Sequence, residues 1–427
     1  MHKTFLSFLG IFYFTLFSIH AENLGLDIHG SISQSFIKTT KNDFLFKGTS
    51  DGSFEFSEAV LNVSKSVNNE LRIGAQLLSR NFGDEGNFKS TLDWGYGDYQ
   101  LNQKFGLRGG KIRLPLGFYN EYRDVDAAQT QILLQQGPYF EPMRAFILSY
   151  SGFGIYGNLF SESKLGNIDY DLYVGTLDIP SDFSLLRFIN LGLNTTGGLD
   201  SDRIFGGRTI WNTPVEGLRF GYSLLDYKGA FDTTSPQLIF NQALTNFSIS
   251  DGIEFDASMK IAGIEYQKGA WSFSAEYQMF QMDGKFSTAF QNTFLQSISN
   301  ASLAAGQSSA VASATAQAAL AQTSTSVLSS LSFDQASWYL TANYQYNEKL
   351  SQFISYGEMY ADKSNKGPAI DYRKDTSTGI CYEFSSHWRI KAEYHHYSGS
   401  QNALLPPNKT SIANKWDMFA ARVAFDF

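Results

Sequence analysis

Basic side chains at alternate positions are the first feature of this sequence that could do chemistry. Arg389 and Lys391 are two residues apart, as are Lys111 and Arg113. Residues i and i+2 of an extended strand share a face, so each pair would present two positive charges on one side. A charged segment follows the second pair, at Glu121, Arg123, Asp124 and Asp126. A basic face opposed to such acids would orient charged and dipolar solutes by its field.

A metal or catalytic site around His395 and His396 is the second chemical possibility. In a strand, His395 shares a face with Glu393 and Lys391, and His396 points the other way, so the two histidines do not chelate one ion. The sequence has no HExxH motif, nucleophile elbow or phosphate-binding glycine loop. We therefore expect no catalytic residue, metal or cofactor, and an enzyme, a lipase or protease, is the less favoured alternative.

The elements that position these residues are strands. Trp338, Leu340 and Ala342 alternate with Tyr339 and Thr341, and the same two-residue period recurs from end to end. Each such strand has one apolar and one polar face. We predict roughly 16 strands, an even number, at residues 26–38, 54–66, 70–81, 90–101, 105–114, 144–159, 168–178, 201–211, 217–228, 256–267, 270–282, 335–346, 350–361, 376–385, 388–399 and 414–427.

The connections between these strands alternate strictly in length. The short ones are residues 67–69, 102–104, 160–167, 212–216, 268–269, 347–349 and 386–387, with long ones between them. A soluble sandwich has no reason to put every long loop at one end, whereas bacterial outer-membrane barrels have short periplasmic turns and long external loops. The pattern therefore predicts an all-β fold: a transmembrane antiparallel β-barrel of about 16 strands. The alternative is a soluble sheet with cross-strand aromatic pairs.

The N-terminal residues indicate export. Residues 1–21 combine Lys3, an apolar run and a small residue, Ala21, which is typical of a cleaved signal peptide; an uncleaved anchor is the alternative. The single Cys381 leaves no internal disulfide. The formal net charge of −8 becomes −9 when Lys3 leaves, and this acidity excludes nucleic acid as a partner.

The last residues, ARVAFDF, alternate up to the terminal Phe427. One face carries Phe419, Val423 and Phe425, and the other carries Arg422 and Asp426. Because a barrel leaves no unpaired edge in lipid, we expect this strand to close against the first one, with the Phe face outward. Aromatic residues also lie beside the short turns, as in an interfacial girdle: Phe105, Tyr266, Trp271, Tyr346 and Trp388.

This ending resembles the assembly signal of bacterial outer-membrane proteins, carried by Phe419, Val423, Phe425 and Phe427. The stretch LRGGKIRLPLGFYNEYRDVDAAQTQILLQQGPYFEP, residues 107–142, followed by YSGFGIYG, looks like a porin family related to the phosphate-selective porins. The resemblance implies a homotrimer in the bacterial outer membrane, in contact with lipid, lipopolysaccharide and the barrel-assembly machinery. It also implies passage of small hydrophilic solutes and ions. No residue-level phosphate signature accompanies it; a substrate-specific anion or phosphate channel, and less so a barrel enzyme or adhesin, are the alternatives.

The resemblance also implies that the third long loop, about residues 115–143, folds inward and constricts the pore. Its charges are Glu121, Arg123, Asp124, Asp126 and Glu141, and its apolar centre is residues 132–134. On the wall, a bulge at Gly109–Gly110 would turn Lys111 and Arg113 inward. The full expected basic wall is Arg72, Arg108, Lys111, Arg113, Arg389, Lys391 and Arg422. The basic wall and the acidic loop would set a transverse field across the pore. One alternative is that the loop covers the barrel mouth or a neighbouring subunit. Another is that each basic residue is a solvated lumen residue far from the constriction.

One external loop, about residues 283–334, has an unusual composition. It is rich in Ala and Ser and nearly uncharged. Ala favours helix and Ser opposes it only mildly, so a helical excursion and disorder are both open. A helical excursion would act as a lid or contact surface.

Overall fold

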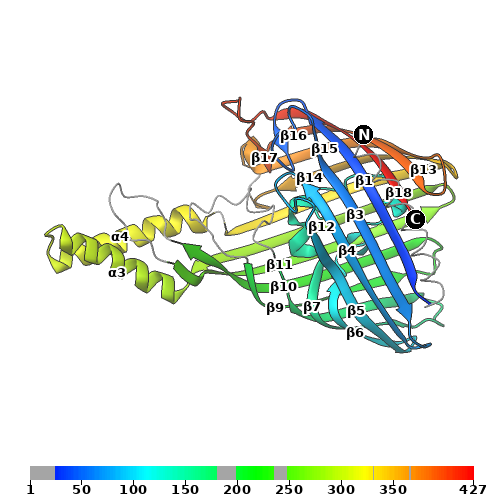
Figure 1. Ribbon diagram of the computed structural model, residues 1–427, viewed down its shortest axis with the longest axis horizontal. Coiled ribbons are helices and arrows are strands. Elements are labelled where there is room, and N and C mark those ends of the chain that lie inside the picture. The colour runs from blue at the N-terminus through cyan, green and yellow to red at the C-terminus, as the bar shows by residue number, and fades with distance from the viewer. Residues whose placement is uncertain (1–24, 180–198, 235–247, 330, 365–366) are drawn as a thin grey trace, which may run out of the picture.

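The computed structural model describes residues 25–179, 199–234, 248–329, 331–364 and 367–427. Within them, 16 strands form one closed antiparallel barrel (Figure 1) in which neighbours in sequence are neighbours in space and β18 closes on β1. The prediction of such a barrel is confirmed. The predicted signal peptide, residues 1–21, lies outside the described residues.

Each predicted strand has a counterpart in the barrel. The barrel strands are β1 Asp27–Thr39, β3 Ser53–Ser66, β4 Leu71–Phe82, β5 Ser90–Asn102, β6 Phe105–Arg113, β7 Ser149–Leu159, β8 Asn167–Thr176, β9 Leu199–Asn212, β10 Leu218–Thr234, β11 Ser248–Lys268, β12 Trp271–Phe286, β13 Phe333–Asn347, β14 Leu350–Tyr360, β15 Tyr372–Glu383, β16 Trp388–Gly399 and β18 Lys415–Asp426. Of these, β10, β11 and β12 extend four to eight residues further toward the long loops than predicted. Two short strands, β2 Asp43–Phe44 and β17 Ala403–Leu404, pair separately. The strand predicted at residues 144–159 begins later, because Arg144–Ile147 forms a short helix, α2.

The closing strand has the two faces that its sequence predicts. Phe419 and Val423 are 45% and 41% exposed on the outer face, and Arg422 is buried inside. β18 pairs with β1 in register, and Phe427 and Gly30 exchange two backbone hydrogen bonds of 3.0 Å. No edge is left open between the first and last strands.

The inner face of β9–β12 is not polar throughout, which corrects the expectation of one apolar and one wet face along each strand. In β11, Phe255, Met259 and Ile261 point inward and are at most 2% exposed. Further along the same strand the inward residue is Glu265, and the apolar Ile264 lies on the outer face, 40% exposed. The apolar pattern therefore changes faces partway along the strand: inside near the long loops, outside near the short turns.

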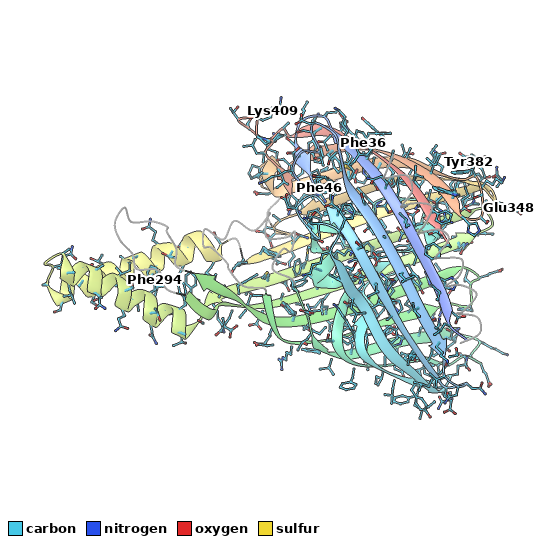
Figure 2. All side chains as sticks on the ribbon, in the orientation of Figure 1. Phe36, Phe46, Phe294, Glu348, Tyr382 and Lys409 are labelled. Carbon is cyan, nitrogen blue, oxygen red and sulfur yellow. The ribbon has the colours of Figure 1, made fainter. Side chains whose placement is uncertain are left out.

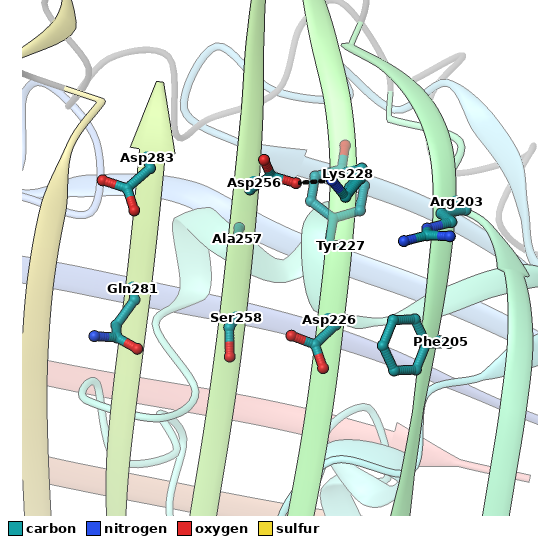
Figure 3. A pocket seen from close by; sticks show the side chains of 10 residues that line it. All are labelled: Arg203, Phe205, Asp226, Tyr227, Lys228, Asp256, Ala257, Ser258, Gln281 and Asp283. Carbon is teal, nitrogen blue, oxygen red and sulfur yellow. Dashed lines mark ion pairs between the residues drawn. The ribbon is translucent and has the colours of Figure 1, made fainter. Parts of the chain in front are cut away.

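Where the inside of β9–β12 is apolar, the outside is charged. Figure 3 shows this outer surface, a groove with Arg203, Asp226, Lys228, Asp256 and Asp283 from four adjacent strands. The Lys228 ammonium lies 2.7 Å from the Asp256 carboxylate. A charged outside over an apolar inside is the arrangement of a water-soluble protein, so this part of the sheet is built for water.

The Ala/Ser-rich loop is helical. α3 (Thr288–Ala304) and α4 (Ser309–Leu328) form a hairpin that projects away from the barrel (Figure 1). The Ser287 side chain caps α3 by accepting from the Phe290 amide at 3.2 Å. Phe290 and Phe294 continue the apolar cluster at the long-loop end of the barrel into the hairpin, where small residues such as Ala316 let the helices pack closely; Phe294 is labelled in Figure 2. Across the described residues, no helix has the length and apolar character needed to cross a bilayer.

Candidate functional site

The third long loop, residues 114–148 between β6 and β7, lies inside the barrel. Its Gly117 amide donates to Ser223 on β10 (3.0 Å), and its Thr130 hydroxyl donates to Ser351 on β14 (3.1 Å). On the side opposite β6 and β7, Arg373 of β15 donates to the Gln136 carbonyl at 2.7 Å. The apolar centre of the loop, Ile132, Leu133 and Leu134, is buried. The loop therefore crosses the lumen, and it does not cover the outside of the mouth.

The first tether of the loop is Asp126, in the first half of the loop sequence. Its carboxylate lies 3.1 Å from the Lys391 ammonium of β16 and 3.2 Å from the Arg422 guanidinium of β18. Lys391 also donates to the carbonyls of Asp126 and Gln131. Burial alone would raise the pKa of Asp126, but the two cations outweigh it and lower that pKa below its usual value. Asp126 is therefore a carboxylate at neutral pH and ties the loop to two wall strands.

A second tether surrounds Asp124. The Arg144 guanidinium lies 2.7 Å from Asp124 and 2.8 Å from Asp93 of β5, so one loop cation joins a loop acid to a wall acid. Arg113 lies 3.9 Å from Asp124. Burial raises the pKa of Asp124, but Arg144 and Arg113 outweigh it and hold that pKa far below its ordinary value. Gln76 of β4 donates to Asp93 at 2.7 Å and completes the cluster.

A third tether centres on Glu141. It pairs with Arg123 of the loop at 2.7 Å and with Arg80 of β4 at 2.9 Å. Burial raises its pKa, but the two guanidiniums outweigh it and lower that pKa to about 2. The Arg80 guanidinium also lies 4.3 Å from the centre of the Phe82 ring, a cation–π distance. Arg123 also donates to the Tyr139 carbonyl at 3.4 Å, so each partner of Glu141 is held by a further contact.

The first part of the loop is held on the β8–β12 side. Glu121 pairs with Arg208 of β9 at 2.6 Å, and its carbonyl accepts from Arg113. Glu276 of β12 accepts from the Phe118 amide at 2.9 Å and from the Tyr139 hydroxyl at 2.6 Å. Burial, with Glu276 beside it, keeps the pKa of Tyr139 well above its ordinary value, so this hydroxyl remains a donor.

Of the basic wall residues predicted from sequence, three contact the loop: Arg113, Lys391 and Arg422. Arg108 is one step removed, since its partner Asp171 also binds Arg208. The charges of wall and loop are in direct contact, whereas the expected transverse field required them to face each other across open space.

Three other predicted wall residues lie apart from the loop. Arg72 donates to Ser64 near the short turns, and Arg389 pairs with Asp426 and Glu383. Lys111 donates to the Leu92 carbonyl. Lys111 also shares a face with Gly109, whose cross-strand partner Phe153 is 73% exposed on the outside of the barrel. Lys111 therefore lies on the outer face. Gly110 has a φ of +130°, but the pairing of β6 with β7 keeps one register through Gly109 and Gly110. The predicted bulge is therefore absent from this pairing.

Sequence reasoning missed several residues that hold the loop. They are Arg80, Asp93, Arg208, Glu276 and Glu393 on the wall and Arg144 in the loop. The inward face of β4 gave a usable signal, because Arg72, Gln76 and Arg80 follow one another at even spacing. Glu276 and Glu393 gave none: Glu393 is the single acid of β16, and the other acid of β12, Asp283, lies on the outer surface of the sheet.

His395 and His396 have separate surroundings in β16. His396 lies on the outer face with Asp417, and His395 lies inside, which confirms their predicted separation. The His395 ring is held between Asp375 at 3.0 Å and Glu393 at 3.2 Å. Ser377 is its partner across the strands, but both ring nitrogens are already bound to carboxylates and neither is free to take the serine proton. In the described ranges, no cluster of three or more His, Cys, Asp or Glu side chains is arranged to hold a metal ion.

Above the loop, toward the long-loop end, apolar side chains cluster on the inner wall and on the loop. Phe146 packs on Tyr227 of β10 and Phe280 of β12, and Phe140 packs on Phe44 of β2. These residues belong to one continuous cluster that includes the apolar inner face of β9–β12. Below the loop, toward the short turns, a polar cavity of about 270 Å³ separates it from the inner faces of β11–β13. The loop therefore divides the lumen into an apolar part and a polar part.

Comparison with known proteins gives relatives in structure alone. No protein-family model matches the sequence, and no curated protein is similar to it. Three solved structures resemble the barrel over 94% of this chain: a trimer form of OmpT, an outer membrane protein of Vibrio cholerae (12% identity, 99% of that chain, TM-score 0.53), an anion-selective porin from Comamonas acidovorans (12%, 99%, 0.54) and Salmonella typhi OmpF in complex with daunomycin (13%, 97%, 0.55). The fold is that of an outer-membrane barrel. At these identities the likeness concerns the fold.

Proposed function

We propose that this chain is an outer-membrane porin through which small hydrophilic solutes and ions diffuse passively. The observation that carries the proposal is the loop of residues 114–148, which crosses the lumen of a closed 16-strand barrel. An apolar outer belt suits lipid, and the charged side chains around the loop suit water. One of the structures it resembles is described as an anion-selective porin, which supports a channel rather than an enzyme.

The same proposal places the protein in the bacterial outer membrane. Residues 1–21 would be removed on export, and the C-terminal strand would be read by the barrel-assembly machinery. The outer belt would contact lipid and lipopolysaccharide. A homotrimer is supported by the trimer form of the Vibrio cholerae protein.

In this proposal the loop is the constriction, lined by Arg113, Lys391 and Arg422 with Asp124 and Asp126. These cations and carboxylates are paired at short range. Paired charges cancel at a distance, so we expect weak ion selectivity. Of the finer alternatives, a solute-specific channel is favoured by the uncharged polar cavity below the loop; no arrangement of the described residues favours phosphate.

The test is electrical. The mature chain, residues 22–427, would be refolded, inserted in a planar bilayer and recorded across a KCl gradient. We expect stepwise, ohmic openings with a reversal potential close to zero. Absence of current from protein that resists protease as a folded, inserted barrel would refute the channel and favour a plugged adhesin or an enzyme.

A further inference from the structure

The cavity below the loop is lined by side chains that hydrogen-bond without carrying charge. Apart from one acid, its polar lining consists of amides and hydroxyls, contributed by the loop and by the inner faces of β11, β12 and β13. The acid, Glu265, accepts from the Tyr119 hydroxyl at 2.9 Å and pairs with Arg219 of β10. Its charge is therefore compensated, and the cavity has no free charge with which to select an ion.

Two loop amides in this lining lack protein partners. Gln131 and Gln135 are only 9% and 7% exposed, and within the described ranges their side-chain amides form no hydrogen bond. Each amide offers two donors and an acceptor. Both residues line the cavity, so their amides are open to hydrogen bonds with whatever occupies it. Asn343 of β13 faces the same space with another amide.

Aromatic rings supply the rest of the wall. Tyr139 of the loop and Tyr339 of β13 are buried, and both hydroxyls donate to Glu276, at 2.6 and 2.7 Å. Tyr119 packs edge-on against Tyr139, with ring centres 6.0 Å apart. Tyr139 and Tyr339 are almost completely buried, so the ring that presents apolar surface beside the amides is that of half-buried Tyr119.

We propose that this cavity is a binding subsite for a neutral, polyhydroxylated solute of about one sugar ring. Hydroxyl groups both donate and accept and so match the free amides, and the C–H face of a sugar ring matches the exposed part of the Tyr119 ring. The cavity of about 270 Å³ is at the small end of ligand sites and suits one ring. The proposal rests on the channel function, since the subsite would lie on the path of a permeating solute.

The test compares glucose with gluconate, which has a similar size but carries a negative charge. The wild type, a Gln131→Leu/Gln135→Leu double variant and a Gln103→Leu control would be recorded in planar bilayers with each sugar added. The same proteins, refolded in detergent, would be assayed for glucose binding by equilibrium dialysis. Gln103 lies in a short turn outside the lumen and controls for the loss of an amide.

We expect glucose to reduce the ion current saturably and gluconate to have less effect. Loss of two amides should raise the half-blocking and half-binding glucose concentrations at least about fivefold, and the control should match the wild type. Ohmic current that is indifferent to glucose overturns the subsite and leaves the channel standing. The same holds if glucose blocks the wild type and the double variant equally. Glucose binding that depends on the two glutamines, without any conductance, supports the subsite and refutes the channel.

Discussion

Asp126→Asn is the sharpest test of how the loop is held. The change keeps the size of the side chain and removes the charge that Lys391 and Arg422 share. Both cations are buried, with side chains only 1% and 7% exposed. Removing one partner of a buried ion pair leaves an uncompensated charge and costs about 3–5 kcal/mol.

The remaining contacts of the two cations set the magnitude. Lys391 keeps the carbonyls of residues 126 and 131, and Arg422 keeps Ser35 at 2.8 Å and Glu58 at 3.4 Å. These contacts favour the lower end of the range, about 3 kcal/mol. Such a loss shifts the ratio of tethered to released loop about 100-fold toward release.

Single-channel recording measures this shift directly. In Asp126→Asn we expect frequent transitions to a larger conductance that the wild type visits rarely. Asp426→Asn is the matched control, because it breaks a lumenal ion pair with Arg389 that does not touch the loop. If a folded Asp126→Asn protein shows the same amplitudes and transition rates as the control, the pairs at Asp126 do not hold the loop.

Three further predictions follow from the same contacts. Low pH should free the loop: because Glu141 has a folded pKa of about 2, below its usual value, its tether is complete above about pH 4.5 and is lost toward pH 2. Current fluctuations should therefore be constant from pH 7 to 5 and rise only below that range. Fluctuations that begin near pH 6 would contradict this. Replacing Arg108 and Arg113 together with Ser leaves Asp98, Asp171 and Asp124 less compensated, so the reversal potential across a KCl gradient should move toward cation preference, and an unchanged value would place both arginines outside the constriction. Deleting Phe427 removes its two backbone bonds to Gly30 and should lower the yield of membrane-assembled barrel, measured by heat-modifiable gel mobility, whereas an unchanged yield would show that the terminal residue is dispensable.

The strands were predictable from sequence because their signal is local. A period of two follows from the pleat itself, and it placed β16 at residues 388–399, as observed. The same period does not say which face meets lipid at a given height. In β11 the apolar residues change from the inner face at Ile261 to the outer face at Ile264. This change can be seen only in the folded barrel, where the position of the loop in the lumen is known.

The partners of the loop were not predictable, because they are distant in sequence. Asp126 and Lys391 are more than 260 residues apart, and no local pattern encodes their meeting. Charge type suggested that basic wall residues and acidic loop residues oppose each other, but not that they touch. Arg144 shows a further limit: its strand-like neighbours predicted an extended segment, whereas Arg144–Ile147 is a short helix within the loop, where Arg144 pairs with Asp93 and Asp124.

The long strands have a consequence for the direction of approach to the barrel. β11 has 21 residues and β14 has 11, and the ten additional residues correspond to about 34 Å of strand. The rim is therefore uneven, with β10–β12 and the α3–α4 hairpin standing above one side (Figure 1). A large molecule that approaches the mouth from that side meets the charged outer sheet first, whereas the opposite side presents a lower rim.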